Sequence, residues 1–328
     1  MPGSVEGGTA TCLGFVNGES TPAFAAKIFR NPDAGEEARA ERDILKGIHE
    51  HSSEVGRSVP RVILCEKISG RWVLVESILQ GAPMMMDMSQ DGFPLIEQAI
   101  RNMKLAKDWL IEFNRAPAKD KDGTEGRIAS LDEKIKLFVA RFGPSENEIR
   151  FLNRMRDSVS LFARERQETY IQHGDFCRHN ILIEDHGKSN RINVIDWSFS
   201  RGGLSPFHDL YFFLSTYFLQ MRKENGLSGF KNAFRNSFID TNRYSGLVRE
   251  IIADYCVKLS IEPAVAPFFF GLFLLEQTLF EYNQLARCRG QGIIPRFNIY
   301  LSLIGNRGFG DVDTEILWIH FFKLFIEL

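Results

Sequence analysis

Three residues in the middle of the chain have types and spacing suited to phosphoryl transfer. Asp175 is followed five residues later by Asn180, and Asp196 comes at the end of a later predicted strand. A carboxylate such as Asp175 can accept a proton from an attacking hydroxyl group. Carboxylate and amide oxygens are the ligands that Mg²⁺ prefers, so Asn180 and Asp196 are candidate metal ligands. The pattern predicts a metal-assisted phosphotransferase site.

The elements around these residues are predicted to bring them together. Residues 181–184 and 191–196 have the composition of β-strands, and residues 185–188 between them have the composition of a turn. A hairpin of this kind places Asn180 and Asp196 at the same end of the ribbon. We therefore expect the two candidate metal ligands to lie close in space.

The first 80 residues are predicted to be mainly strand. Residues 11–16 and 23–29 are short apolar runs around an Asn-Gly pair, which is a hairpin signal. Residues 33–50 follow the period of a helix, and residues 59–65 and 72–78 are predicted to be two further strands. This part of the chain is expected to form a small antiparallel sheet that carries one helix.

The remainder is predicted to be largely helical. The expected helices cover residues 95–114, 131–142 and 146–168 and most of the chain after residue 206. The chain as a whole is therefore expected to have an α+β fold, with an N-terminal domain at residues 1–78 and a helical domain at residues 79–328. Phe is unusually common, at 28 residues against 7 Tyr and 4 Trp, and we expect most Phe residues after residue 200 to be core.

The paired motifs carry a family resemblance. Residues 173–180 read H-G-D-x-x-x-x-N and residues 195–197 read I-D-W. Together they resemble the catalytic loop of the aminoglycoside phosphotransferase and choline kinase family, which belongs to the protein-kinase-like superfamily. The resemblance implies a bilobal protein-kinase-like fold, ATP and Mg²⁺ as cofactors, and a small-molecule hydroxyl as acceptor, of the aminoglycoside, choline, sugar or amino-alcohol type.

The resemblance also assigns roles in the nucleotide-binding part. Lys27 matches the lysine that reaches the α and β phosphates, and Glu41 matches the residue that pairs with it. The remaining implied nucleotide-binding residues are Gly7 and Gly8 in a phosphate-covering loop, and Glu76, Ser77 and Ile78 in a hinge whose backbone meets the adenine. The strand that should precede the glycine pair is almost absent, which is a departure from the family pattern.

Three further residues are assigned supporting roles by the resemblance. His173 is expected to position the loop, Arg178 to lie near the transferring phosphate, and Asp209 to brace the loop from a helix. Two positions depart from the family: Cys177 stands where relatives often have a polar residue, and Ser198 where an acidic residue is frequent.

The composition of the chain bears on its binding partners and on the cellular compartment in which it works. Lys and Arg number 40 against 42 Asp and Glu, so the net charge is -2 and there is no general attraction to nucleic acid or to an anionic membrane. The five cysteines are scattered, and no signal sequence is recognised at the start, which together favour the cytoplasm. Residues 264–275 are too short an apolar run for a membrane helix. No oligomeric state is predicted.

Three alternatives compete with the small-molecule kinase. His173, Asp175 and His208 could form an iron-binding triad of two histidines and a carboxylate. The chain could also be a catalytically inactive nucleotide-binding module, or a kinase with a protein acceptor. Glu276, Glu281 and Tyr282 are candidates for lining the acceptor site, but residues 205–328 hold 12 acidic and 12 basic side chains and so indicate no acceptor charge.

Overall fold

The structure is a computed structural model that describes residues 9–87, 93–115, 123–185, 190–219, 226–290 and 317–326. The described chain forms two compact units. The first contains the described residues of 1–85, 108–116 and 171–202, and the second contains those of 86–107, 117–170 and 203–328. The residues with predicted catalytic, metal-binding and nucleotide-binding roles fall in the first unit wherever they are described, so a single unit positions them.

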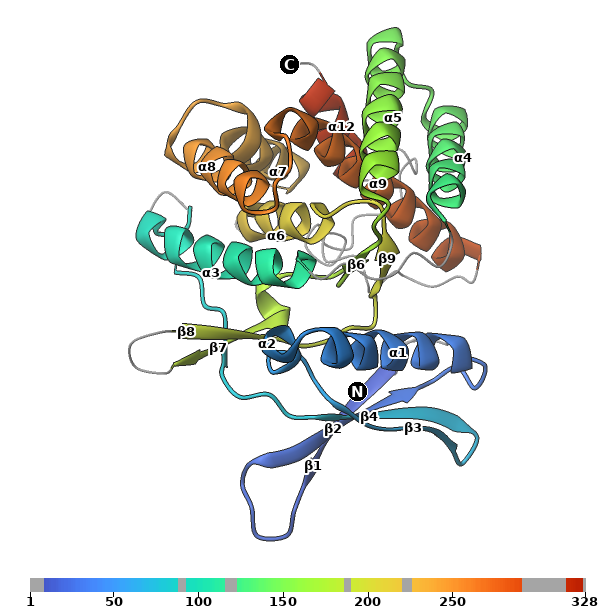
Figure 1. The fold of residues 1–328 in the computed structure, drawn as a ribbon, viewed down its shortest axis with the longest axis vertical. Helices are drawn as coiled ribbons and strands as arrows, with labels where there is room; N and C mark the ends of the chain where they lie inside the picture. Colours follow the sequence, from blue (N-terminus) through green and yellow to red (C-terminus); the bar gives the residue numbers. More distant parts are fainter. Residues whose placement is uncertain are drawn as a thin grey trace. The chain divides into compact units, whose positions relative to one another are not determined.

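A four-stranded antiparallel sheet forms the base of the first unit (Figure 1). Its strands, in the order in which they pair, are β1 (Thr9–Phe15), β2 (Pro22–Phe29), β4 (Arg71–Ser77) and β3 (Val62–Ile68). The turn between β3 and β4 uses Ser69 and Gly70, both with positive φ. The register pairs Lys27 with Leu74, so the two side chains lie on the same face of the sheet.

Helix α1 (Gly35–His51) packs on this sheet because its apolar positions fall on one face. Its Ala38 is fully buried with Leu74, Phe29 and Ala34, and Trp72 packs against the same group. Glu36 and Glu37 lie in its first turn, where carboxylates interact favourably with the helix dipole. The short helix α2 (Ser53–Gly56) follows directly.

A second sheet in the first unit carries the predicted hairpin. It pairs β5 (Ala82–Pro83), β7 (Ile181–Asp185) and β8 (Asn190–Val194) in that order. Asn193 is buried and donates from its side chain to the carbonyl of Gln80 over 2.8 Å. Most of the predicted turn at residues 185–188 lies outside the described residues. Two short strands, β6 (Tyr170–Gln172) and β9 (Arg201–Gly203), form a separate pair.

The second unit is mainly helical. Helix α3 (Ile96–Asn114) begins in it and ends in the first unit. The other helices are α4 (Thr124–Phe142), α5 (Glu146–Arg166), α6 (His208–Leu219), α7 (Gly226–Phe234), α8 (Arg243–Lys258), α9 (Ala266–Gly290) and α12 (Leu317–Ile326). Between α4 and α5, Gly143 ends α4 with φ of 53°, and Ser145 caps α5 in a capping box with Glu148.

Phenylalanine rings fill the core of this helical unit. The three consecutive residues 268–270 turn about 100° apart on α9 and so contact different neighbours. Ring centroids lie 6.1 Å apart for Phe268 and Phe151, 5.3 Å for Phe269 and Phe207, and 4.8 Å for Phe270 and Tyr211. Among the described Phe residues after residue 200, most are buried, as predicted.

One described segment, Pro263–Asn283, is long and apolar enough to cross a membrane by length and composition, with a mean hydropathy of 1.4 in its most apolar window. Of that window, 61% is buried inside the protein. Most of this segment belongs to α9, which packs against α5, α6 and α12.

The fold class is as predicted, with an antiparallel sheet and one long helix in the N-terminal part and helices in the C-terminal part. Element ends differ from the prediction by a few residues; β3, for example, covers Val62–Ile68 instead of residues 59–65. The strand β9 was not predicted, because three residues of composition Arg-Gly-Gly carry no strand pattern.

The aromatic packing leads to a stability prediction. Phe269→Ala should lower the free energy of unfolding by about 3 to 5 kcal/mol, because Phe269 is fully buried and its removal leaves a cavity. The matched control is Phe280→Ala on the same helix, where the side chain is 41% exposed and the loss should be much smaller. Denaturant unfolding of the two variants measures the difference; similar losses would contradict this account of the core.

Candidate active site

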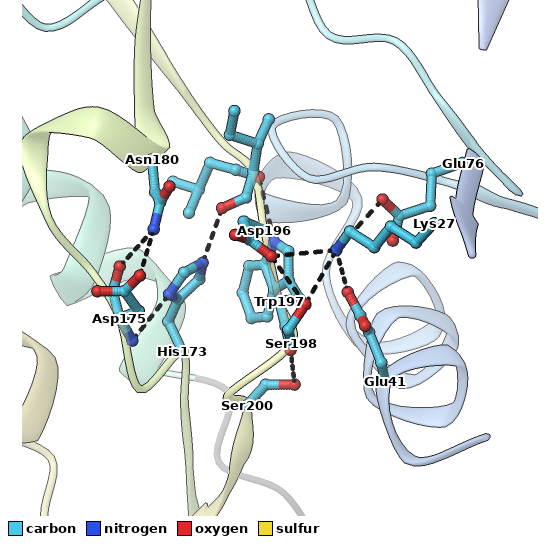
Figure 2. A network of polar contacts seen from close by, with 12 residues as sticks. Lys27, Glu41, Glu76, His173, Asp175, Asn180, Asp196, Trp197, Ser198 and Ser200 are labelled. Atoms are coloured by element: carbon cyan, nitrogen blue, oxygen red, sulfur yellow. Dashed lines mark hydrogen bonds and ion pairs between the residues drawn. The ribbon is translucent and has the colours of Figure 1, made fainter. Parts of the chain in front are cut away.

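The buried ammonium group of Lys27 is the centre of the polar network in the first unit (Figure 2). Lys27 is 5% exposed and forms an ion pair and hydrogen bond with Glu41 of α1. Its Nζ lies 3.3 Å from Oδ1 of Asp196 and 3.6 Å from Oε2 of Glu76. The hydroxyl of Ser198 accepts from the same nitrogen over 3.5 Å. The predicted pairing of Lys27 with Glu41 is therefore present.

Strand register explains why Glu76 faces Lys27. Side chains on a strand alternate between the two faces of the sheet, so Leu74 and Glu76 of β4 share one face. Lys27 of β2 is paired with Leu74 and shares that face as well. Glu76 is only 3% exposed, and its Oε1 has no hydrogen-bond partner among the described residues. The predicted role of Glu76 concerned its backbone; the buried position of its carboxyl was not predicted.

Asp196 and Ser198 follow β8 on a strained turn. Asp196 has φ of 64°, a left-handed conformation that Asp tolerates better than most residues other than Gly. The hydroxyl of Ser198 donates to Oδ1 of Asp196 over 2.8 Å and so fixes the carboxylate beside Lys27. Ser198 therefore serves as a polar link at the position where the family pattern has an acid.

The electrostatics of the network follow from burial and from an excess of carboxylates. Burial alone lowers the pKa of Lys27, but Glu41, Glu76 and Asp196 more than offset this, and the pKa is raised. Burial raises the pKa of Glu76 to about 7, against the opposing effect of Lys27. Burial also raises the pKa of Glu41 despite its pairing with Lys27.

Asp196 differs from these two glutamates. Burial raises the pKa of its carboxyl, but Lys27 and the hydrogen bond from Ser198 more than offset that effect, and the pKa is lowered. Its side chain is 46% exposed, so water stabilises the charge as well. Asp196 is consequently the carboxylate of the network most suited to hold a cation at neutral pH.

His173 ties the predicted catalytic loop to the segment that contains Asp196. Its Nε2 donates to the carbonyl of Ile195 over 3.0 Å, and its Nδ1 accepts from the backbone N–H of Asp175 over 3.3 Å. The ring is fully buried and packs edge-on against Trp197 at 4.7 Å between centroids. Both nitrogens are used internally, so His173 positions the loop, and the iron triad loses one of its proposed ligands.

Asp175 and Asn180 are directly connected. The side-chain amide of Asn180 donates to Oδ2 and to the backbone carbonyl of Asp175, both over 2.9 Å. The amide nitrogen is thus engaged, and the amide oxygen is the atom that remains for a ligand. The backbone N–H of Ile195 donates to the carbonyl of Asn180 over 2.9 Å, so the loop and the Asp196 segment are joined at a second point.

Aromatic residues pack against the predicted catalytic loop and against Trp197. Trp197 is fully buried, and Trp109 and Phe113 near the end of α3 pack against it at 6.5 and 5.7 Å between centroids. Trp109 also stacks on Phe176 at 5.3 Å and donates to the hydroxyl of Ser58 over 2.8 Å. Trp109 and Phe113 were not singled out from the sequence, because apolar residues on a helix indicate core without indicating which element they meet.

The donor set fits a hard cation bound together with a phosphorylated ligand. Asn180 and Asp196 each offer one oxygen, and Mg²⁺ in proteins is usually held by few side chains, with water and phosphate oxygens completing the coordination. Within the described residues, no group of three or more His, Cys, Asp or Glu could hold a metal ion alone.

The remaining predicted residues are placed as follows. Gly7 and Gly8 lie outside the described residues, so their predicted role stays a prediction. The backbone N–H of Ser77 donates to the carbonyl of Arg61, which directly precedes β3, and Ile78 follows the end of β4. Arg178 begins a short 3-10 turn and is partly exposed. Asp209 is 3% exposed in the first turn of α6. The roles predicted for these four residues stay predictions.

Comparison with protein families identifies one match. Residues 15–228 match the model described as the phosphotransferase enzyme family. The matched segment includes Lys27, Glu41, Asp175, Asn180 and Asp196, so it covers the whole network described above. Among curated proteins, no match is found.

Several solved structures resemble the chain at low sequence identity. Aminoglycoside phosphotransferase APH(3'')-Id from Streptomyces rimosus, in complex with ADP and streptomycin, is 17% identical, with 76% of this chain and 86% of that chain covered and a TM-score of 0.45. A GDP complex of aminoglycoside 2'-phosphotransferase-IIIa is 12% identical, with 97% and 92% covered and a TM-score of 0.48. A microcompartment-associated aminopropanol kinase is 13% identical, with 83% and 92% covered and a TM-score of 0.38.

The turn at Gly174 gives a prediction for this site. Gly174 has φ of 81°, and a Cβ there would lie 2.4 Å from the carbonyl oxygen of Phe199. Gly174→Ala should therefore destabilise the first unit by about 1 to 3 kcal/mol through backbone strain alone. Gly47→Ala in α1 is the matched control, because nothing lies within 4 Å of its added Cβ and helix propensity should stabilise it slightly. Denaturant unfolding compares the two; equal midpoints would show that the turn is not strained.

Proposed function

Because this chain belongs to the phosphotransferase enzyme family, we propose that it transfers the terminal phosphoryl group of ATP, with Mg²⁺, to a hydroxyl of a small polar molecule. The observation that carries the proposal is the convergence on Lys27 of Glu41 from α1 and Asp196 from the segment after β8. The hydrogen bonds of His173 to the carbonyl of Ile195 and from the N–H of Asp175, which is the proposed base, support the proposal.

Lys27 provides the positive charge for the nucleotide phosphates. A lysine ammonium is a compact point charge, and burial strengthens its attraction to an anion. The pKa of Lys27 is raised, so the ammonium stays protonated throughout the physiological range. Glu41 holds this ammonium through a direct hydrogen bond, so its position is fixed before nucleotide binds.

Asp175 is the proposed base. In the reaction, the acceptor oxygen forms a bond to the γ-phosphorus while the bond to the leaving diphosphate breaks, and the hydroxyl proton passes to the Asp175 carboxylate. The hydrogen bond from Asn180 to Oδ2 orients this carboxylate. The partial exposure of Asp175 gives a substrate access to it.

Asn180 and Asp196 would hold the metal ion through their oxygens. When bound, Mg²⁺ neutralises charge that develops on the phosphate oxygens. Asp196 keeps its charge at neutral pH because its pKa is lowered, and Ser198 orients it through a hydrogen bond. Asn180 carries no charge, which limits the repulsion between the ligand set and the phosphates.

The acceptor site is proposed to lie in the second unit. Glu276 forms an ion pair with Lys134 over 2.6 Å and lies 3.3 Å from Nδ1 of His208, so its carboxylate is already engaged. Glu281 is 4% exposed, and Tyr282 packs edge-on against Phe142.

Two substitutions test the catalytic assignment. Asp175→Asn should lower turnover by at least about 100-fold and leave nucleotide affinity nearly unchanged, because it removes the proton acceptor and keeps the shape. Asp196→Ala should abolish Mg²⁺-dependent nucleotide binding. Asp185→Asn, at an exposed position on the same hairpin, is the control and should have no effect. Steady-state kinetics and nucleotide titrations measure the outcome, and an unchanged rate in Asp175→Asn would remove Asp175 from the mechanism.

The acceptor is identified by an ATP-consumption screen over amino alcohols, choline, sugars and aminoglycosides. Turnover with one class supports the proposal and names the substrate. Nucleotide binding without transfer to any acceptor, including protein substrates, would instead indicate an inactive nucleotide-binding module. Absence of nucleotide binding would overturn the proposal.

A further inference from the structure

Glu76 is a buried carboxyl whose position suits a role that its backbone does not explain. Its Oε2 lies 3.6 Å from Nζ of Lys27, beyond hydrogen-bond distance, and its Oε1 has no hydrogen-bond partner among the described residues. Glu41 has the hydrogen bond to Lys27 that Glu76 lacks. Burial of an ionised carboxylate with so few partners is unfavourable, so the geometry itself favours the protonated form.

The charge around Lys27 supports the same conclusion. One ammonium faces three carboxyl groups: Glu41 on α1, Glu76 on β4 and Asp196 after β8. If all three are ionised, the network carries two uncompensated negative charges in a largely buried place. Asp196 is partly exposed and Glu41 is hydrogen-bonded, so Glu76 is the group that gains most from taking up a proton.

We propose that Glu76 is a proton-linked positioning residue, which is present in both its ionised and its protonated form beside Lys27 in the free protein and becomes protonated when nucleotide phosphates bind to Lys27. The inference rests on the proposed function, because it requires a nucleotide at Lys27. It adds a role for this side chain: Glu76 competes with the phosphates for the ammonium and releases it on protonation.

The pKa of Glu76 lies near neutral pH, as a proton-linked role requires. Burial raises the pKa of Glu76 to about 7, Lys27 opposes this, and Glu41 and Asp196 reinforce it. Its paired neighbours on β2 and β3, Ala25 and Val62, carry no charge. Both forms of Glu76 are therefore populated near neutral pH in the free protein.

The charge of the nucleotide determines whether binding takes up or releases a proton at Glu76. Phosphates at Lys27 bring negative charge near Glu76 and engage the ammonium, and both effects raise the pKa of Glu76 further. Nucleotide binding must then take up protons between the free and bound pKa values. Nucleotide affinity should consequently fall as pH rises through about 7, by tenfold for each unit that binding adds to the pKa.

Calorimetry of Mg-ADP binding tests this without requiring an acceptor. Binding heats at pH 7.5 in two buffers of different ionisation enthalpy give the number of protons taken up. Wild type should take up roughly half a proton more than Glu76→Gln, which is isosteric and cannot titrate. Glu66→Gln, an exposed carboxyl on β3, is the control and should behave as wild type. Subtracting the variants removes protons exchanged by the nucleotide itself.

The outcomes separate the two proposals. If wild type does not bind Mg-ADP at any pH, the proposed function fails. If it binds, and Glu76→Gln takes up as many protons as wild type, the role of Glu76 is wrong. In active enzyme, the pH dependence of the nucleotide KM should flatten in Glu76→Gln, with little change in the pH dependence of kcat, whereas a merely structural role would not change the KM profile.

Unfolding without nucleotide provides a second measurement. A raised carboxyl pKa lowers the stability of the folded protein as pH rises from the ordinary value of 4.5 to about 7. Glu76→Gln should therefore be stabilised relative to wild type at pH 8, and the gain should vanish near pH 5. An identical difference at both values would overturn the proposal. Glu76→Met, which also cannot titrate, takes the place of Glu76→Gln if that variant does not fold.

Discussion

The buried ammonium of Lys27 is the interaction on which the first unit depends. A charged group with 5% exposure is stable only where counter-charges replace its water. Those counter-charges come from separate elements: Glu41 from α1, Glu76 from β4 and Asp196 from the segment after β8. Satisfying one charge therefore fixes a sheet, a helix and the start of a loop relative to one another. The same requirement that stabilises the fold also builds the place where phosphate can bind.

A second set of contacts carries this order to the proposed base. Ile195 accepts a hydrogen bond from His173 and donates one to Asn180, and it directly precedes Asp196. Asn180 in turn holds the carboxylate of Asp175. The position of Asp175 is thus linked to that of Lys27 through the side chains of His173 and Asn180 and through backbone groups of the short segment that leads to Asp196. Backbone links of this kind favour a site that is ordered before its ligands arrive.

Much of this arrangement could be predicted from the sequence, and the part that could not has a physical reason. Asp175, Asn180 and Asp196 stand at fixed spacings around a hairpin, and Lys27 and Glu41 lie on a strand and the helix after it, so local patterns locate them. The position of Glu76 depends on the β2–β4 register, which pairs Lys27 with Leu74. A shift by one residue would turn Glu76 to the opposite face, and no local pattern sets that register. Ser198 depends on the left-handed turn at Asp196, which is equally invisible in composition.

The two glutamates that flank Lys27 differ because their elements constrain them differently. Glu41 projects from a helix, and its side chain reaches the ammonium and hydrogen-bonds to it. Glu76 is held by a central strand whose backbone is bonded on both sides, so its carboxylate stays 3.6 Å from Nζ. A partner at that distance gains Coulomb energy without a hydrogen bond, and burial removes the water that would compensate. The strand carboxyl is therefore the weaker partner of the two and the one that a competing anion would displace first, whereas the helix carboxyl keeps the ammonium in place. One lysine can in this way remain fixed and still be available to a phosphate.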